Sequence, residues 1–141
     1  MKTLTTLTGF SMAAIIALGA GCSSADQAQA NDAASAAGDA AAGEKVFNKC
    51  KACHMIGDGA KNRVGPSLTG IVDEEIASNP DFKYSDAFME KKAEGVVWTD
   101  EVLHEYLISP KAFAPGTKMT FVGLPKEKDR DDVVAYLMTF E

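Results

Sequence analysis

The sequence has no excess of positive charge, and this excludes one large class of functions. Its 141 residues include 14 lysines and arginines against 20 aspartates and glutamates, which gives a formal net charge of −6. Proteins that bind nucleic acids neutralise phosphates with clustered basic side chains. An acidic chain therefore points away from a nucleic acid partner, and its charge bears instead on how protein partners approach it.

Alternating strand patterns and internal repeats are also missing, so the sequence predicts an all-α fold. Asp39 can cap a first helix that runs to about Cys53. The segment 55–83 is rich in glycine and proline and has no periodicity, so we expect a long loop there. Pro110 ends a helix that starts at Thr99. Two further helices are expected at 85–92 and 126–140.

Cysteine is scarce, and its placement is the most informative feature of the chain. Cys50 and Cys53 are separated by two residues and followed at once by His54. This Cys-x-x-Cys-His pattern is typical of covalent haem attachment, in which each thiol binds a vinyl group and the imidazole becomes an axial ligand of the iron. A structural zinc site needs four ligands, and the chain has no second Cys-x-x-Cys. A thioredoxin-like dithiol belongs beside a βαβ pattern, which is absent here.

The first 42 residues lack the composition of a folded domain. Residues 1–21 include a charge-free run of 13 residues from Gly9 to Gly21, which is short for a membrane span and typical of a signal sequence or N-terminal anchor. Cys22 then resembles the lipidated cysteine of bacterial lipoproteins, although Leu18 stands one position further from it than in the usual signal. We interpret the alanine-rich residues 22–42 as a flexible tether. Lipidation of Cys22, ordinary cleavage and an uncleaved anchor remain alternatives.

Residues 43–141 resemble a monohaem class I cytochrome c domain, as in bacterial membrane-tethered relatives of mitochondrial cytochrome c. Besides Cys-Lys-Ala-Cys-His at 50–54, the motifs are Gly-Pro-Ser-Leu at 65–68, Phe-Lys-Tyr-Ser-Asp at 82–86, Trp98, Tyr-Leu at 106–107, Ser-Pro-Lys at 109–111, Pro-Gly-Thr-Lys-Met at 115–119 and Val-Ala-Tyr-Leu at 134–137. The resemblance implies four or five short helices and long loops wrapped around one covalent haem c. A loop as long as 55–83 is then acceptable, because it packs on the haem.

The resemblance implies that His54 and Met119 are the two axial ligands of the iron, with the carbonyl of Pro66 accepting a hydrogen bond from His54. Among six methionines, Met119 is singled out because it lies in a loop stiffened by Pro115. The only other histidine, His104, raises the alternative of two histidine ligands. Its position on the expected helix faces away from the apolar stripe, so we expect it to face solvent.

Other site residues also follow from the resemblance. Tyr84 and Trp98 would donate hydrogen bonds to a haem propionate, with simple core packing as the alternative. Three residues would hold the methionine loop, namely Tyr106, Thr117 and Phe121. Three others, Gly43, Phe47 and Tyr136, would form the crossing of the first and last helices.

One position departs from the family pattern. The family usually has Gly-Arg, with the arginine near a propionate, where this chain has Asp73 and Glu74. An acid beside a propionate raises the cost of ionising it. We therefore expect Glu74 to turn to solvent, or Lys61 or Arg63 to compensate.

The resemblance implies a single-electron carrier of a respiratory or photosynthetic chain, and not an enzyme. It suggests a quinol–cytochrome c reductase as donor and a terminal oxidase as acceptor, on the periplasmic side of a bacterial membrane to which the N-terminus tethers the protein. The alternative is a small haem peroxidase or gas-binding protein with a labile methionine ligand. Four lysines lie in segments that frame the haem edge in the family and are either a local basic patch or ordinary solvated residues: Lys49, Lys51, Lys111 and Lys118.

Overall fold

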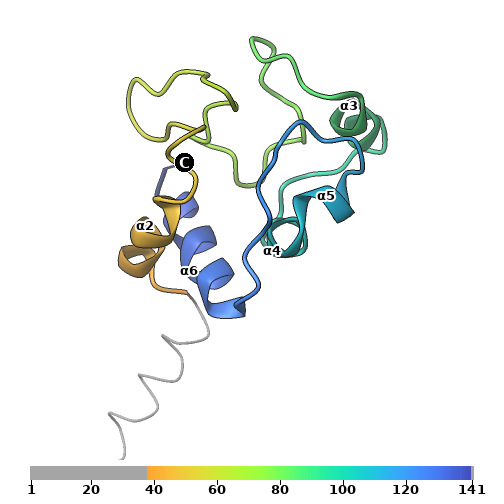
Figure 1. Cartoon of the computed structure of the whole chain (residues 1–141). Helices are drawn as coiled ribbons and strands as arrows, with labels where there is room; N and C mark the ends of the chain where they lie inside the picture. Colours follow the sequence, from red (N-terminus) through yellow and green to blue (C-terminus); the bar gives the residue numbers. More distant parts are fainter. Residues whose placement is uncertain (1–37, 141) are drawn as a thin grey trace, which may run out of the picture.

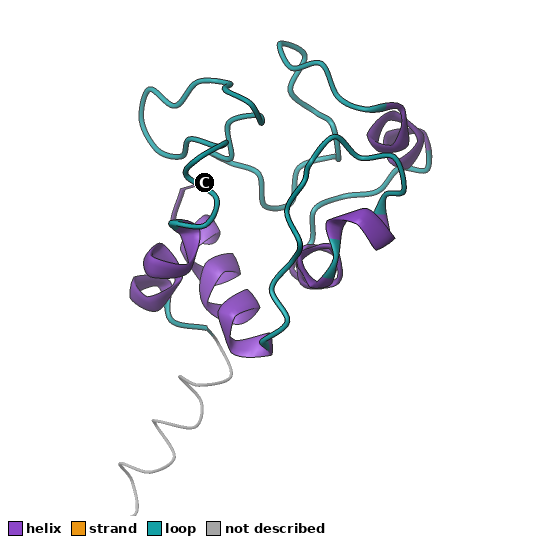
Figure 2. Ribbon diagram, in the orientation of Figure 1, coloured by secondary structure: helices purple, strands orange, loops and turns teal. Residues whose placement is uncertain are grey.

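The computed structural model describes residues 38–140, where the regular secondary structure is helical. Five α-helices follow one another along this part of the chain, and the last continues into a short 3₁₀-helix (Figures 1 and 2). They are α2 (Ala40–Phe47), α3 (Asp86–Ala93), α4 (Asp100–Ile108), α5 (Pro110–Phe113), α6 (Glu127–Leu137) and η1 (Met138–Phe140). The described residues contain one isolated antiparallel bridge, between Glu75 and Val97, and no strand. The expected all-α fold is confirmed.

Helix α2 begins where the sequence predicts and ends earlier. The carboxylate of Asp39 accepts hydrogen bonds from two backbone N–H groups of the first turn, at 2.8 and 3.1 Å, and so caps the helix. The α-helix stops at Phe47, and the chain continues through Cys53 in successive turns instead of the predicted helix. Because α2 starts at Ala40, the helix itself includes three residues that we interpreted as tether, and Asp39 caps it.

Helices α2 and α6 lie against each other and cross in close contact (Figure 1). Gly43 is buried where they meet, and a Cβ atom there would overlap the carbonyl of Asp132 and lie 2.7 Å from the Cβ of Tyr136. One turn further, the rings of Phe47 and Tyr136 pack with their centroids 5.3 Å apart. The missing side chain at position 43 therefore lets the two backbones approach, as the family resemblance implied.

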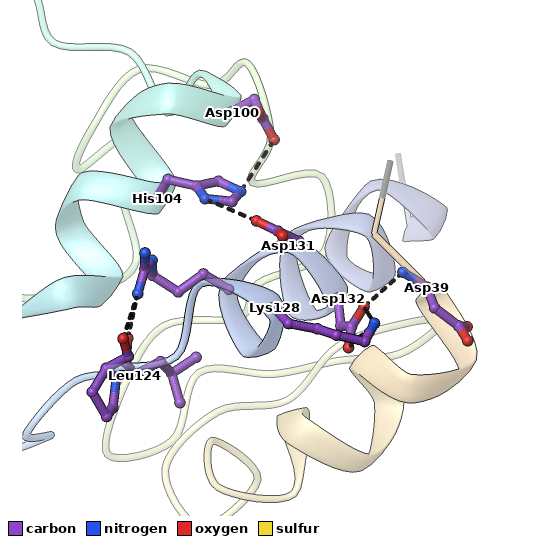
Figure 3. A network of polar contacts seen from close by, with 9 residues as sticks. Asp39, Asp100, His104, Leu124, Lys128, Asp131 and Asp132 are labelled. Carbon is purple, nitrogen blue, oxygen red and sulfur yellow. Dashed lines mark hydrogen bonds and ion pairs between the residues drawn. The ribbon is translucent and has the colours of Figure 1, made fainter. Parts of the chain in front are cut away.

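A buried carboxylate reinforces this crossing. Asp132 is only 4% exposed, and it accepts hydrogen bonds from the N–H of Asp39 at 2.8 Å and from Nζ of Lys128 at 2.8 Å (Figure 3). Burial raises the pKa of Asp132, but the Lys128 ammonium and the Asp39 N–H outweigh it, so the net pKa lies below its ordinary value. The interaction therefore stabilises the fold at neutral pH, and this contribution is lost as the pH falls through the lowered pKa.

The helical pattern predicted that His104 faces solvent, but the structure places its ring beside two carboxylates. Its side chain is 25% exposed, and its Nδ1 lies 3.4 Å from the carboxylate of Asp131 on α6 (Figure 3). Its Nε2 lies 3.8 Å from the carboxylate of Asp100, one turn earlier on α4. The apolar stripe of α4 gave no sign of this arrangement, because α6 packs against α4 and brings Asp131 to the polar side of that helix.

Pro110 begins a helix as well as marking the end of one. Helix α4 ends at Ile108, and Ser109 is extended, with its hydroxyl accepting a hydrogen bond from the N–H of Ala112 at 3.4 Å. Pro110 then occupies the first turn of α5, where a missing N–H costs no hydrogen bond. The short helix α5 was therefore missed in the sequence, where the proline indicated only a helix end.

The long loop before α3 contains two residues in backbone conformations that favour glycine. Asp73 has φ of 60° and Ala77 has φ of 57°. A residue with a side chain pays roughly 1–2 kcal/mol for this left-handed region. A glycine, which the family pattern has at position 73, would adopt this conformation without that cost, whereas this chain has an aspartate there.

We expect Gly43→Ala to destabilise the domain, although alanine has the higher helix propensity. In an exposed helix the substitution would stabilise by about 1 kcal/mol, whereas overpacking a close contact costs about 1–3 kcal/mol. Chemical denaturation followed by circular dichroism gives the sign. Glu44→Ala, at the next and exposed position, is the control and is expected to change stability by less than about 0.5 kcal/mol. A Gly43→Ala variant more stable than the parent would contradict the close crossing.

Candidate cofactor-binding site

A cavity of about 640 Å³ lies between the helices and the long loops. It has the volume of a ligand pocket, and most of its wall is apolar or aromatic. The apolar part of the wall includes Phe47, Leu68, Ile71, Phe82, Phe88, Leu103, Leu107, Val133 and Leu137. All ten residues proposed from the sequence to contact a cofactor also line it: Cys50, Cys53, His54, Pro66, Tyr84, Trp98, Tyr106, Thr117, Met119 and Phe121.

The two cysteines lie in the turns that follow α2. The carbonyl of Cys50 accepts hydrogen bonds from the N–H groups of Cys53 and His54, both at 3.0 Å, and this turn directs three neighbouring side chains to one cavity. Both thiols are free and half-buried. Burial raises the pKa of Cys50 to about 11, with Lys49 partly opposing the effect and Cys53 adding to it. The described residues contain no group of three or more histidine, cysteine, aspartate or glutamate side chains placed to hold a metal ion.

His54 is held in one tautomer. Its Nδ1 lies 2.7 Å from the carbonyl oxygen of Pro66, and because a carbonyl only accepts, Nδ1 carries the hydrogen and Nε2 is left as an acceptor or ligand. Burial lowers the pKa of His54, against the opposing effect of the Pro66 hydrogen bond, so the ring is neutral at neutral pH. Gly65 lies behind the ring, where any Cβ atom would overlap it.

The loop that carries Met119 is fixed by three contacts. The hydroxyl of Tyr106 donates to the sulfur of Met119 at 2.7 Å, and the hydroxyl of Thr117 accepts from the N–H of Met119 at 3.2 Å. Burial raises the pKa of Tyr106 far above its ordinary value, so its hydroxyl remains a donor. The ammonium of Lys118 donates to the carbonyl of Tyr84 at 3.1 Å and joins the methionine loop to the loop before α3.

One end of the cavity is polar. Trp98 is 4% exposed, and its ring packs against Tyr106 with centroids 4.9 Å apart. Burial raises the pKa of Tyr84, opposed by a backbone hydrogen bond with Asn79. Beside Tyr84, the buried hydroxyl of Ser85 lines the cavity and has no hydrogen-bond partner within the described chain. A buried hydroxyl without a partner is costly, so it points to a polar group of a bound ligand.

Ser85 is a site residue that sequence reasoning missed. It stands directly before α3, at the expected start of the helix 85–92, and its side chain makes no capping hydrogen bond. Its place next to Tyr84 in the Phe-Lys-Tyr-Ser-Asp motif was the available signal. Gly65 was likewise quoted only as part of a motif, and its proximity to the His54 ring depends on a fold that local sequence does not reveal.

The residues present fit a haem. Two thiols, a neutral imidazole and a thioether line a mainly apolar cavity, while tyrosine, tryptophan and an unpartnered serine line its polar part. A haem has a broad apolar macrocycle, vinyl groups that thiols can bind, and two carboxylates that need hydrogen-bond donors. The lining therefore offers a group of suitable chemistry for each part of the cofactor.

Comparisons with known proteins agree with this site. The family model for cytochrome c matches residues 40–141. Cytochrome c-550 of Ancylobacter novellus is 54% identical over 100 residues, which cover 71% of this chain and 94% of that protein. Cytochrome c2 of Afifella marina is 54% identical over 101 residues, covering 72% of this chain and 82% of the relative. The solved structure of cytochrome c2 from Rhodospirillum centenum is 44% identical, with a TM-score of 0.70, and covers 73% of this chain and 98% of its own.

The fold, the cavity and the similarity over nearly the whole described range all point to one family. Cys50, Cys53 and His54 of the Cys-x-x-Cys-His sequence line the cavity, within the residues that the family model matches. The chain therefore belongs to the class I cytochromes c, and it is an electron carrier with one covalently attached haem c, for which Cys50 and Cys53 provide the attachment motif.

Proposed function

We propose that this protein shuttles single electrons in the bacterial periplasm and that His54 and Met119 ligate its haem iron. The observation that carries the proposal is that both side chains line one cavity and that each is oriented by a hydrogen bond. His54 is neutral and presents a free Nε2, while Met119 lies in a loop fixed by Tyr106 and Lys118. Both ligands would then be in place before and after each electron transfer.

This ligand pair favours electron transfer over catalysis. When bound, the haem supplies a one-electron Fe(III)/Fe(II) couple. A thioether favours the reduced state and raises the potential, and a firmly held Met119 occupies the position that oxygen or peroxide would need. The alternative function, a small haem peroxidase or gas-binding protein, requires Met119 to be labile. The contacts of Tyr106, Thr117 and Lys118 restrain the loop that carries Met119. They therefore favour an electron carrier over a peroxidase or gas-binding protein.

The polar residues at the other end of the cavity have a matching role. Tyr84, Trp98 and Ser85 would donate hydrogen bonds to the haem propionates. Phe121 would cover the haem beside Met119, because it lines the same cavity two residues further along the loop. These groups would keep the carboxylates hydrogen-bonded and water away from the macrocycle.

A docking surface for redox partners would surround the cavity mouth. Val64 and Val122 line the cavity and are 79% and 87% exposed, so they form an apolar part of the rim of its opening. The basic character of this surface is weaker than the sequence suggested, because Lys49 pairs with Asp129 at 3.0 Å and Lys118 is engaged by backbone carbonyls. Lys51 and Lys111 are exposed. We expect these two lysines to steer acidic partners, with a quinol–cytochrome c reductase as donor and a terminal oxidase as acceptor.

Attachment to the membrane is proposed from the sequence, because residues 1–37 lie outside the described range. Between residues 38 and 140, no helix combines the length and apolar character that a bilayer crossing needs. Lipidated Cys22 or an uncleaved N-terminal segment would hold the domain on the periplasmic face. Several acyl chains on one cysteine would be sufficient for stable anchoring.

We expect Met119→Ala to abolish the charge-transfer band between methionine sulfur and ferric iron and to lower the midpoint potential, because a soft ligand to Fe(II) is lost. The ferrous variant should bind carbon monoxide rapidly at neutral pH, and the parent should not. Met89→Ala, on the exposed surface of α3, is the control and should retain the band. Rapid carbon monoxide binding by the parent protein would favour the peroxidase or gas-binding alternative.

We expect the double variant K51Q/K111Q to be reduced more slowly by a bacterial quinol–cytochrome c reductase, by about twofold to tenfold at low ionic strength, because electrostatic steering is weakened. The difference should shrink as salt is added. The variant K45Q/K126Q makes the same charge change at exposed lysines on α2 and directly before α6, outside the segments expected to frame the haem edge. Equal rate losses in both double variants would show that only net charge matters and would exclude a local docking surface.

We expect Cys22→Ser to release the protein from membranes, because the lipid anchor can no longer be attached. Fractionation of cells that express the parent and the variant, with detection of haem in the soluble and membrane fractions, measures the effect. A variant that stays in the washed membrane fraction would show that the apolar N-terminal segment is itself the anchor.

A further inference from the structure

A second, polar cavity of about 450 Å³ adjoins the haem cavity, and Glu74 lines it. Its other polar residues are Ser67, Thr69, Ser78, Asn79 and Tyr84. Ile71 and Tyr84 line both cavities, so the two meet at the end where Tyr84 and Ser85 offer hydrogen bonds. An acidic side chain therefore borders the part of the haem site that suits the propionates.

The backbone of Glu74 is fixed in this position. Its carbonyl accepts the N–H of Trp98 at 2.8 Å, and the N–H of Asp73 donates to the carbonyl of Trp98 at 3.0 Å. Asp73 makes the left-handed turn that precedes it. Of the three consecutive acids in this segment, Glu74 lines the polar cavity, whereas Asp73 and Glu75 do not.

Within the described part of the chain, Glu74 forms no ion pair. The cavity lining contains no lysine or arginine. Lys61 and Arg63, the two candidates for compensation, do not line the cavity. The guanidinium of Arg63 instead donates to the carbonyl of Lys51 at 3.2 Å. Of the two expected outcomes, the structure confirms the first, because Glu74 is exposed to solvent. Compensation by Lys61 or Arg63 is not supported.

We propose that Glu74 is an electrostatic tuning residue that lowers the midpoint potential of the haem. The inference rests on the proposed function, in which one electron is added to the iron at each reduction. That electron adds one negative charge to the haem site. The negative charge of Glu74, at the propionate end and without a paired cation, disfavours the added charge and so stabilises the oxidised protein.

Glu74→Gln tests the proposal by removing one charge while retaining the shape of the side chain. At a fixed ambient potential and pH 7, the ratio of Fe(II) to Fe(III) should be about twofold higher in the variant than in the parent, because the charge of the exposed Glu74 is partly screened by water. For a one-electron couple, a tenfold change in this ratio corresponds to about 59 mV. Glu74→Lys should shift the ratio further in the same direction.

Asp73→Asn is the matched control, because it removes the same charge one residue away and asparagine tolerates the left-handed conformation. Glu75 is unsuitable as a control, since its removal would free Lys92, which pairs with it at 3.2 Å. The control should shift the ratio by less than half as much as Glu74→Gln, measured on a logarithmic scale. Unchanged absorption and circular dichroism spectra establish that each variant is folded and loaded.

Two results would overturn the proposal: no shift in Glu74→Gln, or a shift in Asp73→Asn at least half as large. Either result leaves the proposed function intact, provided that the parent protein has a reversible one-electron couple and the methionine–iron band. A parent protein without that couple or that band would contradict the proposed function itself, so the two failures are distinguishable.

Discussion

The hydrogen bond from Nδ1 of His54 to the carbonyl of Pro66 is the constraint on which the site depends. At 2.7 Å it fixes the tautomer and the ring orientation of His54, and it connects the Cys-x-x-Cys-His turn to the loop that follows. Gly65 leaves space for the ring, because any Cβ atom there would overlap it. Met119 is oriented in a similar way, because the hydroxyl of Tyr106 donates a hydrogen bond to its sulfur at 2.7 Å. Two potential ligands from distant parts of the chain are thus oriented by neighbouring groups rather than by a single rigid element.

The helices position these loops by packing at two places. The crossing of α2 and α6 brings the end of the first helix, and with it the cysteine turn, against the last helix. Helix α4 contributes Tyr106 to the cavity and contacts α6, with His104 and Asp131 facing each other between them. The buried apolar residues come from helices and loops alike, and several of them, among them Phe47, Trp98 and Leu103, line the cavity of about 640 Å³. The haem therefore completes the hydrophobic core, which explains how a small domain with short helices forms a stable fold.

Much of this arrangement could be predicted from the sequence, because short motifs contain the residues that line the cofactor site. Local sequence indicates the helix caps at Asp39 and Thr99. Short motifs indicate the ten site residues that line the cavity. The features that could not be predicted depend on which elements meet in space. The early end of α2, the contact of His104 with Asp131 and the unpartnered hydroxyl of Ser85 are of this kind. Glu74 has one feature of each kind. Its departure from the family pattern is visible in the sequence, whereas only the fold shows that no lysine or arginine of the described chain lines its cavity.

The function depends on one haem that is bound covalently to Cys50 and Cys53 in this cavity. Mass spectrometry of the mature, denatured polypeptide, combined with titration of its thiols, tests this attachment most directly. We expect a mass that exceeds that of the processed chain by one haem, with a haem-bearing peptide that contains both cysteines and no free thiol at either position. A colourless polypeptide with the mass of its amino acids alone, and with both thiols titratable, would contradict it.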